Sequence, residues 1–163
     1  MLKEGQVAPS FSLPDADMMM VSSAEFRDTK NVILFFYSLE DSAECTIKAI
    51  EFSDMVHDFR IEKTAVIGVN TDCCGCHAKF RDKYGLSILL LSDTTGDICN
   101  AYEVWQKHPP QTNNKWKKCI RDSTFIIDKK GVIRHIMHET NPVGHAEHTL
   151  GLIRSLGKPS EAA

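Results

Sequence analysis

Two apolar runs constrain the fold of this chain most strongly. Val32–Tyr37 and Thr64–Asn70 are short, predominantly apolar stretches rich in β-branched residues, which is typical of strands buried on both faces of a sheet. Between them, residues 46–60 carry apolar side chains at helical spacing. A buried strand, a helix and a second buried strand together predict a parallel sheet covered by helices.

The rest of the sequence continues this alternation. The further predicted elements are a helix from an N-cap at Asp72 to about Lys83, a strand at Ile88–Leu91, a helix over 96–102, a hairpin of Ser123–Asp128 and Val132–Glu139, and a closing helix at Gly144–Leu156. Residues 108–118 are predicted as a loop. The order indicates an α/β, thioredoxin-like fold: a central mixed sheet, helices on both faces and an N-terminal extension. We expect a single domain over residues 1–163, with 157–163 as a flexible tail.

Composition argues against several classes of function. The net charge is −3, so electrostatics gives no reason to expect nucleic acid or an anionic membrane as a partner. No stretch approaches the roughly 18 apolar residues of a membrane span. The first six residues do not resemble a secretory signal, so we expect a cytoplasmic protein. In a reducing compartment, six cysteines indicate catalysis or metal binding rather than structural disulfides.

Cys45 is the first candidate for chemistry, because it lies where a buried strand gives way to a helix. Backbone N–H groups at the start of a helix stabilise an anion, and a thiolate is the nucleophilic form of cysteine. The alternative is a buried cysteine that packs as a small apolar residue. The polar neighbours Ser42, Glu44 and Thr46 argue against such a core position.

The remaining cysteines form one cluster and two single positions. Cys73, Cys74 and Cys76 lie together at the start of a predicted helix, where thiolates are also favoured. Two alternatives stay open for them: a metal site that includes His77, or inert surface thiols. Cys99 lies on an apolar helical face and is predicted to be a core residue, and Cys119 follows the loop over residues 108–118.

The chain resembles the peroxiredoxins of the bacterioferritin-comigratory, or Q, type. The resemblance covers residues 3 to 156, and the joint order of its motifs makes it specific. The matching segments are Gly5–Asp15, Val69–Asp72 with His77 and Phe80, Leu91–Asp93, Tyr102–Trp105, Arg121–Asp128 and Gly144–Ala146. The resemblance implies a thiol peroxidase without metal or other cofactor, which reduces hydrogen peroxide and organic hydroperoxides through a cysteine sulfenic acid.

The family's active-site motif, P-x-x-x-T-x-x-C, implies a role for three positions. Cys45 matches the peroxidatic cysteine, Ser42 replaces the threonine but keeps a hydroxyl, and Ser38 replaces the proline. The resemblance assigns Arg121 as the guanidinium that stabilises the leaving oxygen. An alternative for Arg121 is a surface pairing with Asp122 or Asp128.

Lys48 departs from the family pattern, which tends to place an acid three residues after the cysteine. Its charge can favour a Cys45 thiolate, but it removes an acidic partner for the arginine. Glu44 and Glu51 are possible substitutes for that partner.

The family's usual resolving cysteines are missing, since Ile50 and Arg81 occupy their positions. The resemblance therefore makes Cys76, Cys74 and Cys73 the resolving candidates, with Cys76 preferred and Cys119 a weaker one. A disulfide requires Cα atoms within about 7 Å, so we expect local helix unwinding. The implied partners are a peroxide and a thioredoxin-like thiol reductant, and the implied assembly is a monomer or weak homodimer.

Two other functions remain as alternatives. The replacements at Ser38 and Lys48 are also consistent with a redox-sensing or thiol-interaction protein that has kept the fold and lost turnover. A disulfide reductase centred on Cys45 is disfavoured, because Ser42 and Lys48 leave that cysteine without a C-x-x-C partner.

Overall fold

The computed structural model describes residues 1–38, 42–108 and 117–156. In chain order the elements are β1 (Ser12–Pro14), β2 (Met20–Ser22), a short 3-10 helix (Ser23–Glu25), β3 (Asn31–Phe36), α1 (Ala43–Asp54), α2 (Val56–Ile61), β4 (Thr64–Asn70), α3 (Cys74–Tyr84), β5 (Leu89–Ser92), α4 (Asp97–Ala101), β6 (Trp105–His108), β7 (Lys117–Ile120), β8 (Ser123–Ile127), β9 (Ile133–His138) and α5 (His145–Leu156). The tail predicted over 157–163 lies outside the described residues.

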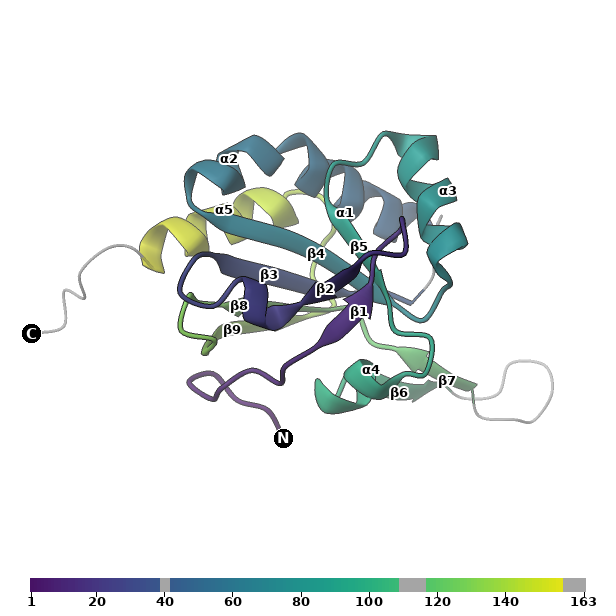
Figure 1. Cartoon of the computed structure of the whole chain (residues 1–163), viewed down its shortest axis with the longest axis horizontal. Helices are drawn as coiled ribbons and strands as arrows, with labels where there is room; N and C mark the ends of the chain where they lie inside the picture. Colours follow the sequence, from purple (N-terminus) through teal and green to yellow (C-terminus); the bar gives the residue numbers. More distant parts are fainter. Residues whose placement is uncertain (39–41, 109–116, 157–163) are drawn as a thin grey trace, which may run out of the picture.

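A five-stranded mixed sheet forms the centre of the molecule, with strand order β5-β4-β3-β8-β9 (Figure 1). The strands β3, β4 and β5 run parallel, while β8 pairs antiparallel with both β3 and β9. Every residue of β3 is buried, because this strand has neighbours on both sides and packed layers on both faces. The two apolar runs therefore form buried strands, as the sequence predicts, and the structure places them side by side in the sheet.

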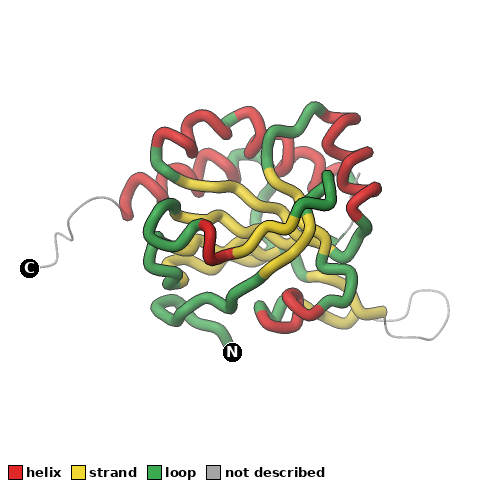
Figure 2. The backbone as a smooth tube through the Cα atoms, in the orientation of Figure 1, coloured by secondary structure: helices red, strands yellow, loops and turns green. Residues whose placement is uncertain are grey.

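Helices cover both faces of the sheet, as predicted, but unequally (Figures 1 and 2). The helices α1, α2, α3 and α5 pack on one face, where Phe52, Phe59, Phe80 and Ile153 join one buried cluster. The opposite face is covered by α4, the β1–β2 hairpin and the β6–β7 hairpin, and includes the fully buried Cys99. The predicted core position of Cys99 is confirmed.

Three local predictions differ from the structure. The helix expected over 46–60 begins at Ala43 and divides into α1 and α2 at Met55. The loop expected over 108–118 was wrong at both ends, because His108 belongs to β6 and Lys117 and Lys118 belong to β7, which pairs antiparallel with β6. Residues 109–116 lie outside the described part. The N-cap of α3 is Cys73 rather than Asp72, because the Asp72 carboxylate instead accepts a hydrogen bond from the Asn70 side chain at 2.9 Å.

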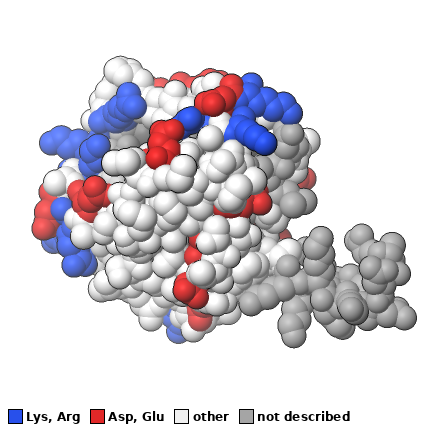
Figure 3. Space-filling model, turned by 45° about the vertical axis from the view of Figure 1, so that its right-hand side comes forward, with Lys and Arg blue, Asp and Glu red and all other residues white. Residues whose placement is uncertain are grey.

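The charge distribution on the surface and the length of the helices bear on nucleic acid and membrane as partners. On the face shown in Figure 3, acidic and basic side chains lie in small separate groups around a largely uncharged area, so that face offers no continuous basic track for a polyanion. Among the helices that the structure describes, none is long and apolar enough to cross a bilayer.

Candidate active site

Cys45 lies in the first turn of α1, directly after the central strand β3 and the loop that follows it. Ser42 is the N-cap of this helix, and its Oγ accepts a hydrogen bond from the Cys45 backbone N–H at 3.3 Å. The cap holds the first turn in place, and the remaining N–H groups of that turn favour a negative charge beside them. The predicted strand-to-helix junction is therefore present.

The Cys45 side chain is buried, with 6 % of its surface exposed. The expectation that its polar neighbours keep it out of the core was wrong. Within one helical turn only one side points to the sheet, so Glu44 stays exposed while Cys45 turns inward toward the Phe52 cluster. This low exposure limits contact between the thiol and large reagents.

Lys48 follows Cys45 by one helical turn and is 5 % exposed. Residues three apart share a helix face, with about 5–6 Å between their Cβ atoms, so a buried positive charge accompanies the buried thiol. The charge of the Lys48 ammonium acts to lower the pKa of two other groups near the site, Asp122 and His145. Buried lysine is rare unless paired, and these two neighbours come from the residue just before β8, at the end of the sheet where β3 ends, and from α5.

Asp122 lies just before β8 and beside the Ser38 backbone. Burial raises the pKa of its carboxyl, and Glu44 and Glu139 raise it further, while the Lys48 charge and a hydrogen bond from the Ser38 N–H act in the opposite direction. Its Oδ1 has no hydrogen-bond partner among the described residues. The carboxyl thus lies at the site as a polar group that is incompletely satisfied.

His145, at the start of α5, is a site residue to which the sequence assigned no role. Its Nε2 lies 2.9 Å from Thr124 Oγ1 and its Nδ1 lies 3.0 Å from Thr140 Oγ1. Burial first, and then the charges of Lys48 and His148, lower the pKa of His145 to about 4, so the ring is neutral at pH 7. The sequence feature that could have identified His145 as a site residue is the G-H-A match at Gly144–Ala146.

The Arg121 guanidinium lies at the edge of this region rather than beside Lys48. Its Nε is 3.7 Å from Glu139 Oε1, and the side chain is 42 % exposed. It also faces His138, whose pKa is lowered by burial and, second, by the Arg121 charge. The surface pairing considered for Arg121 is therefore present, although with Glu139; its catalytic role stays a prediction.

The two substitute acids have different positions. Glu51 accepts the Gly144 backbone N–H at 3.2 Å and so supports the start of α5. Glu44 lines a polar surface hollow of about 610 Å³ beside the start of α1. The other lining residues of this hollow are Ser38, Gln106, Ile120, Asp122, Glu139, Thr140, Asn141 and Pro142. Glu44 is the residue of α1 that lines this hollow, and Cys45 is not among its lining residues.

The cysteine cluster begins α3, which follows β4 as α1 follows β3. Cys73 and Cys76 are exposed, Cys74 is partly exposed, and the Sγ atoms of Cys73 and Cys76 lie 2.8 Å apart. The Tyr37 hydroxyl at the end of β3 and His77 Nδ1 in α3 lie 3.3 Å apart and connect the two regions. Within the described ranges, no group of three or more His, Cys, Asp or Glu side chains is placed so that it could hold one metal ion.

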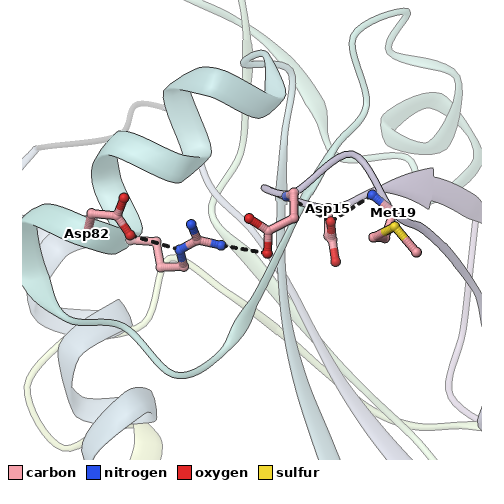
Figure 4. Close-up of polar contacts among 5 residues, drawn as sticks. Asp15, Met19 and Asp82 are labelled. Atoms are coloured by element: carbon pink, nitrogen blue, oxygen red, sulfur yellow. Dashed lines mark hydrogen bonds and ion pairs between the residues drawn. The ribbon is translucent and has the colours of Figure 1, made fainter.

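Arg81 joins α3 to the N-terminal extension through surface ion pairs. Its guanidinium bonds Asp17 at 2.9 Å and Asp82 at 3.1 Å, next to the turn in which Asp15 accepts the Met19 N–H at 2.9 Å (Figure 4). The position at which some family members carry a resolving cysteine is thus used here to attach the N-terminal extension to α3.

The thioredoxin-like sheet and the helix-capped cysteine define a thiol-dependent redox enzyme, and comparisons with known proteins give its family. The model of the AhpC/TSA family matches residues 5–136. A putative peroxiredoxin of Helicobacter pylori is 32 % identical over 149 residues, covering 91 % of this chain and 96 % of the relative. One of Coxiella burnetii is 33 % identical over 150 residues, covering 92 % and 97 %.

A solved structure shows the same fold. The bacterioferritin comigratory protein of Xanthomonas campestris, studied for its alkyl peroxide reduction activity, superposes with a TM-score of 0.84 at 20 % identity, covering 91 % of this chain and 92 % of that one. The chain belongs to the AhpC/TSA family and, within it, to the peroxiredoxins of the bacterioferritin-comigratory type. It is a thiol peroxidase, so the predicted family, fold class and enzyme class are confirmed.

Proposed function

We propose that Cys45 is the peroxidatic nucleophile and that hydrogen peroxide and alkyl hydroperoxides are its substrates. The observation that supports this most strongly is a buried cysteine in the capped first turn of α1, one turn before a buried lysine. The Cys45 thiolate attacks the terminal peroxide oxygen and the O–O bond breaks. The sulfur becomes a sulfenic acid, and the other oxygen leaves as hydroxide or alkoxide and takes up a proton.

Three features favour this step. The N–H groups of the first turn of α1 stabilise negative charge on the sulfur and on the leaving oxygen. The Ser42 hydroxyl accepts the Cys45 N–H, and a hydroxyl can also donate, which is the role the family gives to its threonine. Lys48 supplies a positive charge that the low exposure of the site protects from water.

Lys48 therefore takes the electrostatic role that the family resemblance implies for Arg121. A buried ammonium one turn from the thiol acts more strongly than a half-exposed guanidinium that pairs with Glu139. Arg121 contributes at the rim of the site.

Two observations support this substrate class: the polarity of the hollow beside α1 and the similarity of the fold to a solved structure. The hollow beside α1 is polar and open, which suits hydrogen peroxide and small hydroperoxides, and a protein of similar fold is described for alkyl peroxide reduction. A thioredoxin-like donor returns the enzyme to its thiol form. We propose a cytoplasmic location, where such donors keep thiols reduced, and a monomer or weak homodimer.

Stopped-flow consumption of peroxide tests the proposal. The wild type is expected to react in one fast bimolecular step, and Cys45→Ser is expected to lose it. Cys119→Ser is the matched control, since Cys119 lies in β7, outside the first turn of α1, and should keep the wild-type rate. Full activity in Cys45→Ser contradicts the proposal, and a single turnover that no thiol donor can renew would support the redox-sensing alternative.

A further inference from the structure

A second pair of thiols is built into the start of α3. Cys73 and Cys76 have the C-x-x-C spacing, and their Sγ atoms lie 2.8 Å apart. Cys73 is the N-cap, and its Sγ accepts the Cys76 backbone N–H at 3.3 Å. A C-x-x-C pair that opens a helix directly after a parallel strand has the placement typical of redox-active dithiols. We call these two residues the Cys73–Cys76 pair.

The two thiols of the pair differ in their electrostatics. The pKa of Cys73 is lowered, first by the hydrogen bond from the Cys76 thiol and then by the backbone N–H groups of Cys76 and Gly75. The pKa of Cys76 is raised, first by the same bond to Cys73 and also by the charge of Asp72. These opposite directions favour Cys73 over Cys76 as the attacking thiol of the pair.

The pair is exposed where Cys45 is buried. Cys73 and Cys76 both lie on the surface, while Cys45 is 6 % exposed. A protein reductant must bring its own sulfur into contact with the sulfur that it reduces, and it can do so at the pair far more easily than at Cys45. Since α1 and α3 follow the adjacent parallel strands β3 and β4, both sites lie at the same edge of the sheet.

We propose that the Cys73–Cys76 pair is a second redox centre, a reversible dithiol that takes the oxidising equivalent from Cys45 and passes it to an external thiol reductant. The transfer from Cys45 rests on the proposed function, whereas the redox activity of the pair does not. The pair thereby serves as the resolving centre of a chain that has Ile50 and Arg81 at the family's resolving positions.

The exchange proceeds in two balanced steps. The Cys73 thiolate attacks the Cys45 sulfenic acid, which forms a Cys45–Cys73 disulfide and, with one proton, releases water. The Cys76 thiol then loses its proton and attacks Cys73, which forms the Cys73–Cys76 disulfide and releases the Cys45 thiolate. A dithiol donor reduces this disulfide and is itself oxidised.

The first step needs a movement. A disulfide needs its Cα atoms within about 7 Å, whereas Cys45 is buried at the start of α1 and Cys73 is exposed at the start of another helix, α3. We therefore expect the first turn of α1 or of α3 to open before Cys45 and Cys73 bond. The second step needs only a small approach, because the two sulfurs of the pair are already in contact.

The pair can be tested without peroxide, in a Cys45→Ser protein equilibrated with glutathione buffers of rising potential. We expect the tryptic peptide 64–79, which contains all three clustered cysteines, to lose two hydrogens in a single transition. Cys74→Ser is the matched control and should keep this transition, while Cys73→Ser and Cys76→Ser should each abolish it. No transition in the Cys74→Ser background, or an unchanged one in Cys73→Ser, overturns the proposal.

The transfer is tested with one equivalent of peroxide in a Cys74→Ser, Cys76→Ser protein. We expect a trapped disulfide between peptides 31–48 and 64–79, which carry Cys45 and Cys73. Absence of this link, with Cys45 oxidised, overturns the transfer. If the wild type consumes no peroxide, the proposed function is contradicted instead. The glutathione titration then still decides whether the Cys73–Cys76 pair is redox-active.

Discussion

Lys48 is the single residue that most distinguishes this site. In the sequence it appears as a departure, a base where relatives tend to carry an acid. The structure buries it beside Cys45 and near Asp122 and His145. A positive charge is therefore present at the site, and it comes from Lys48 in α1. Arg121, which lies before β8, is half-exposed and pairs with Glu139.

Replacing Lys48 by methionine keeps much of the side-chain volume and removes the charge. We expect the rate of peroxide consumption to fall by about 10- to 100-fold, somewhat less than the loss of a direct oxyanion donor. The pH at which Cys45 reacts with iodoacetamide should also move upward. Lys30→Met, at an exposed lysine before β3, is the control. If Lys48→Met matches the wild type while Arg121→Gln is inactive, the guanidinium has the role and not the ammonium.

His145 makes stability depend on pH. Its pKa is about 4 in the folded protein against an ordinary 6.5, so between these values the unfolded chain binds a proton that the folded protein does not. The free energy of unfolding is therefore expected to fall by about 3 kcal/mol as the pH drops from 7 to 4.

Urea unfolding of the wild type and His145→Asn at pH 7 and pH 4.5 measures this contribution. The variant loses ring packing against Phe52 and is expected to be less stable at pH 7, but to depend less on pH. All other titrating groups are present in both proteins, so the difference in pH dependence between them reports on His145. An equal pH dependence in both would show that His145 is not the cause.

At the scale of elements, the cap of α1 links stability to chemistry. The Ser42 Oγ satisfies the N–H of Cys45 itself, so the residue that starts the helix also orders the backbone of the nucleophile. The sequence assigned Ser42 through the active-site motif alone and missed its capping role. Caps depend on backbone conformation, which a loop sequence with several serines and acids does not determine.

Ser42→Ala is expected to destabilise the protein by about 1 kcal/mol, the usual cost of losing an N-cap, and to slow peroxide consumption. Ser42→Thr keeps an oxygen at the same position and should preserve both properties. Thermal unfolding and stopped-flow assays on the two variants give the comparison. A stable but slow alanine variant would separate the hydroxyl's catalytic role from its capping role, and a fast one would exclude the former.

At the scale of the whole molecule, the order of strands and helices could be predicted because buried runs and helical periodicity are properties of the sequence itself. The β6–β7 hairpin could not, since Lys117–Ile120 pairs with Trp105–His108 and the sequence between them carries no short-turn signal. The same holds for the site. The position of Cys45 at the start of a helix was predictable from the buried strand before it, whereas its burial, the inward direction of Lys48 and the approach of His145 depend on tertiary packing.

The contrast between a buried Cys45 and an exposed Cys73–Cys76 pair has a consequence for chemical damage. A bulky electrophile would reach the pair and be kept from Cys45. The modified enzyme would then reduce one molecule of peroxide at Cys45 and could not be returned to its thiol form. Pretreatment with a large maleimide should therefore turn continuous peroxide consumption into a burst of one equivalent per chain.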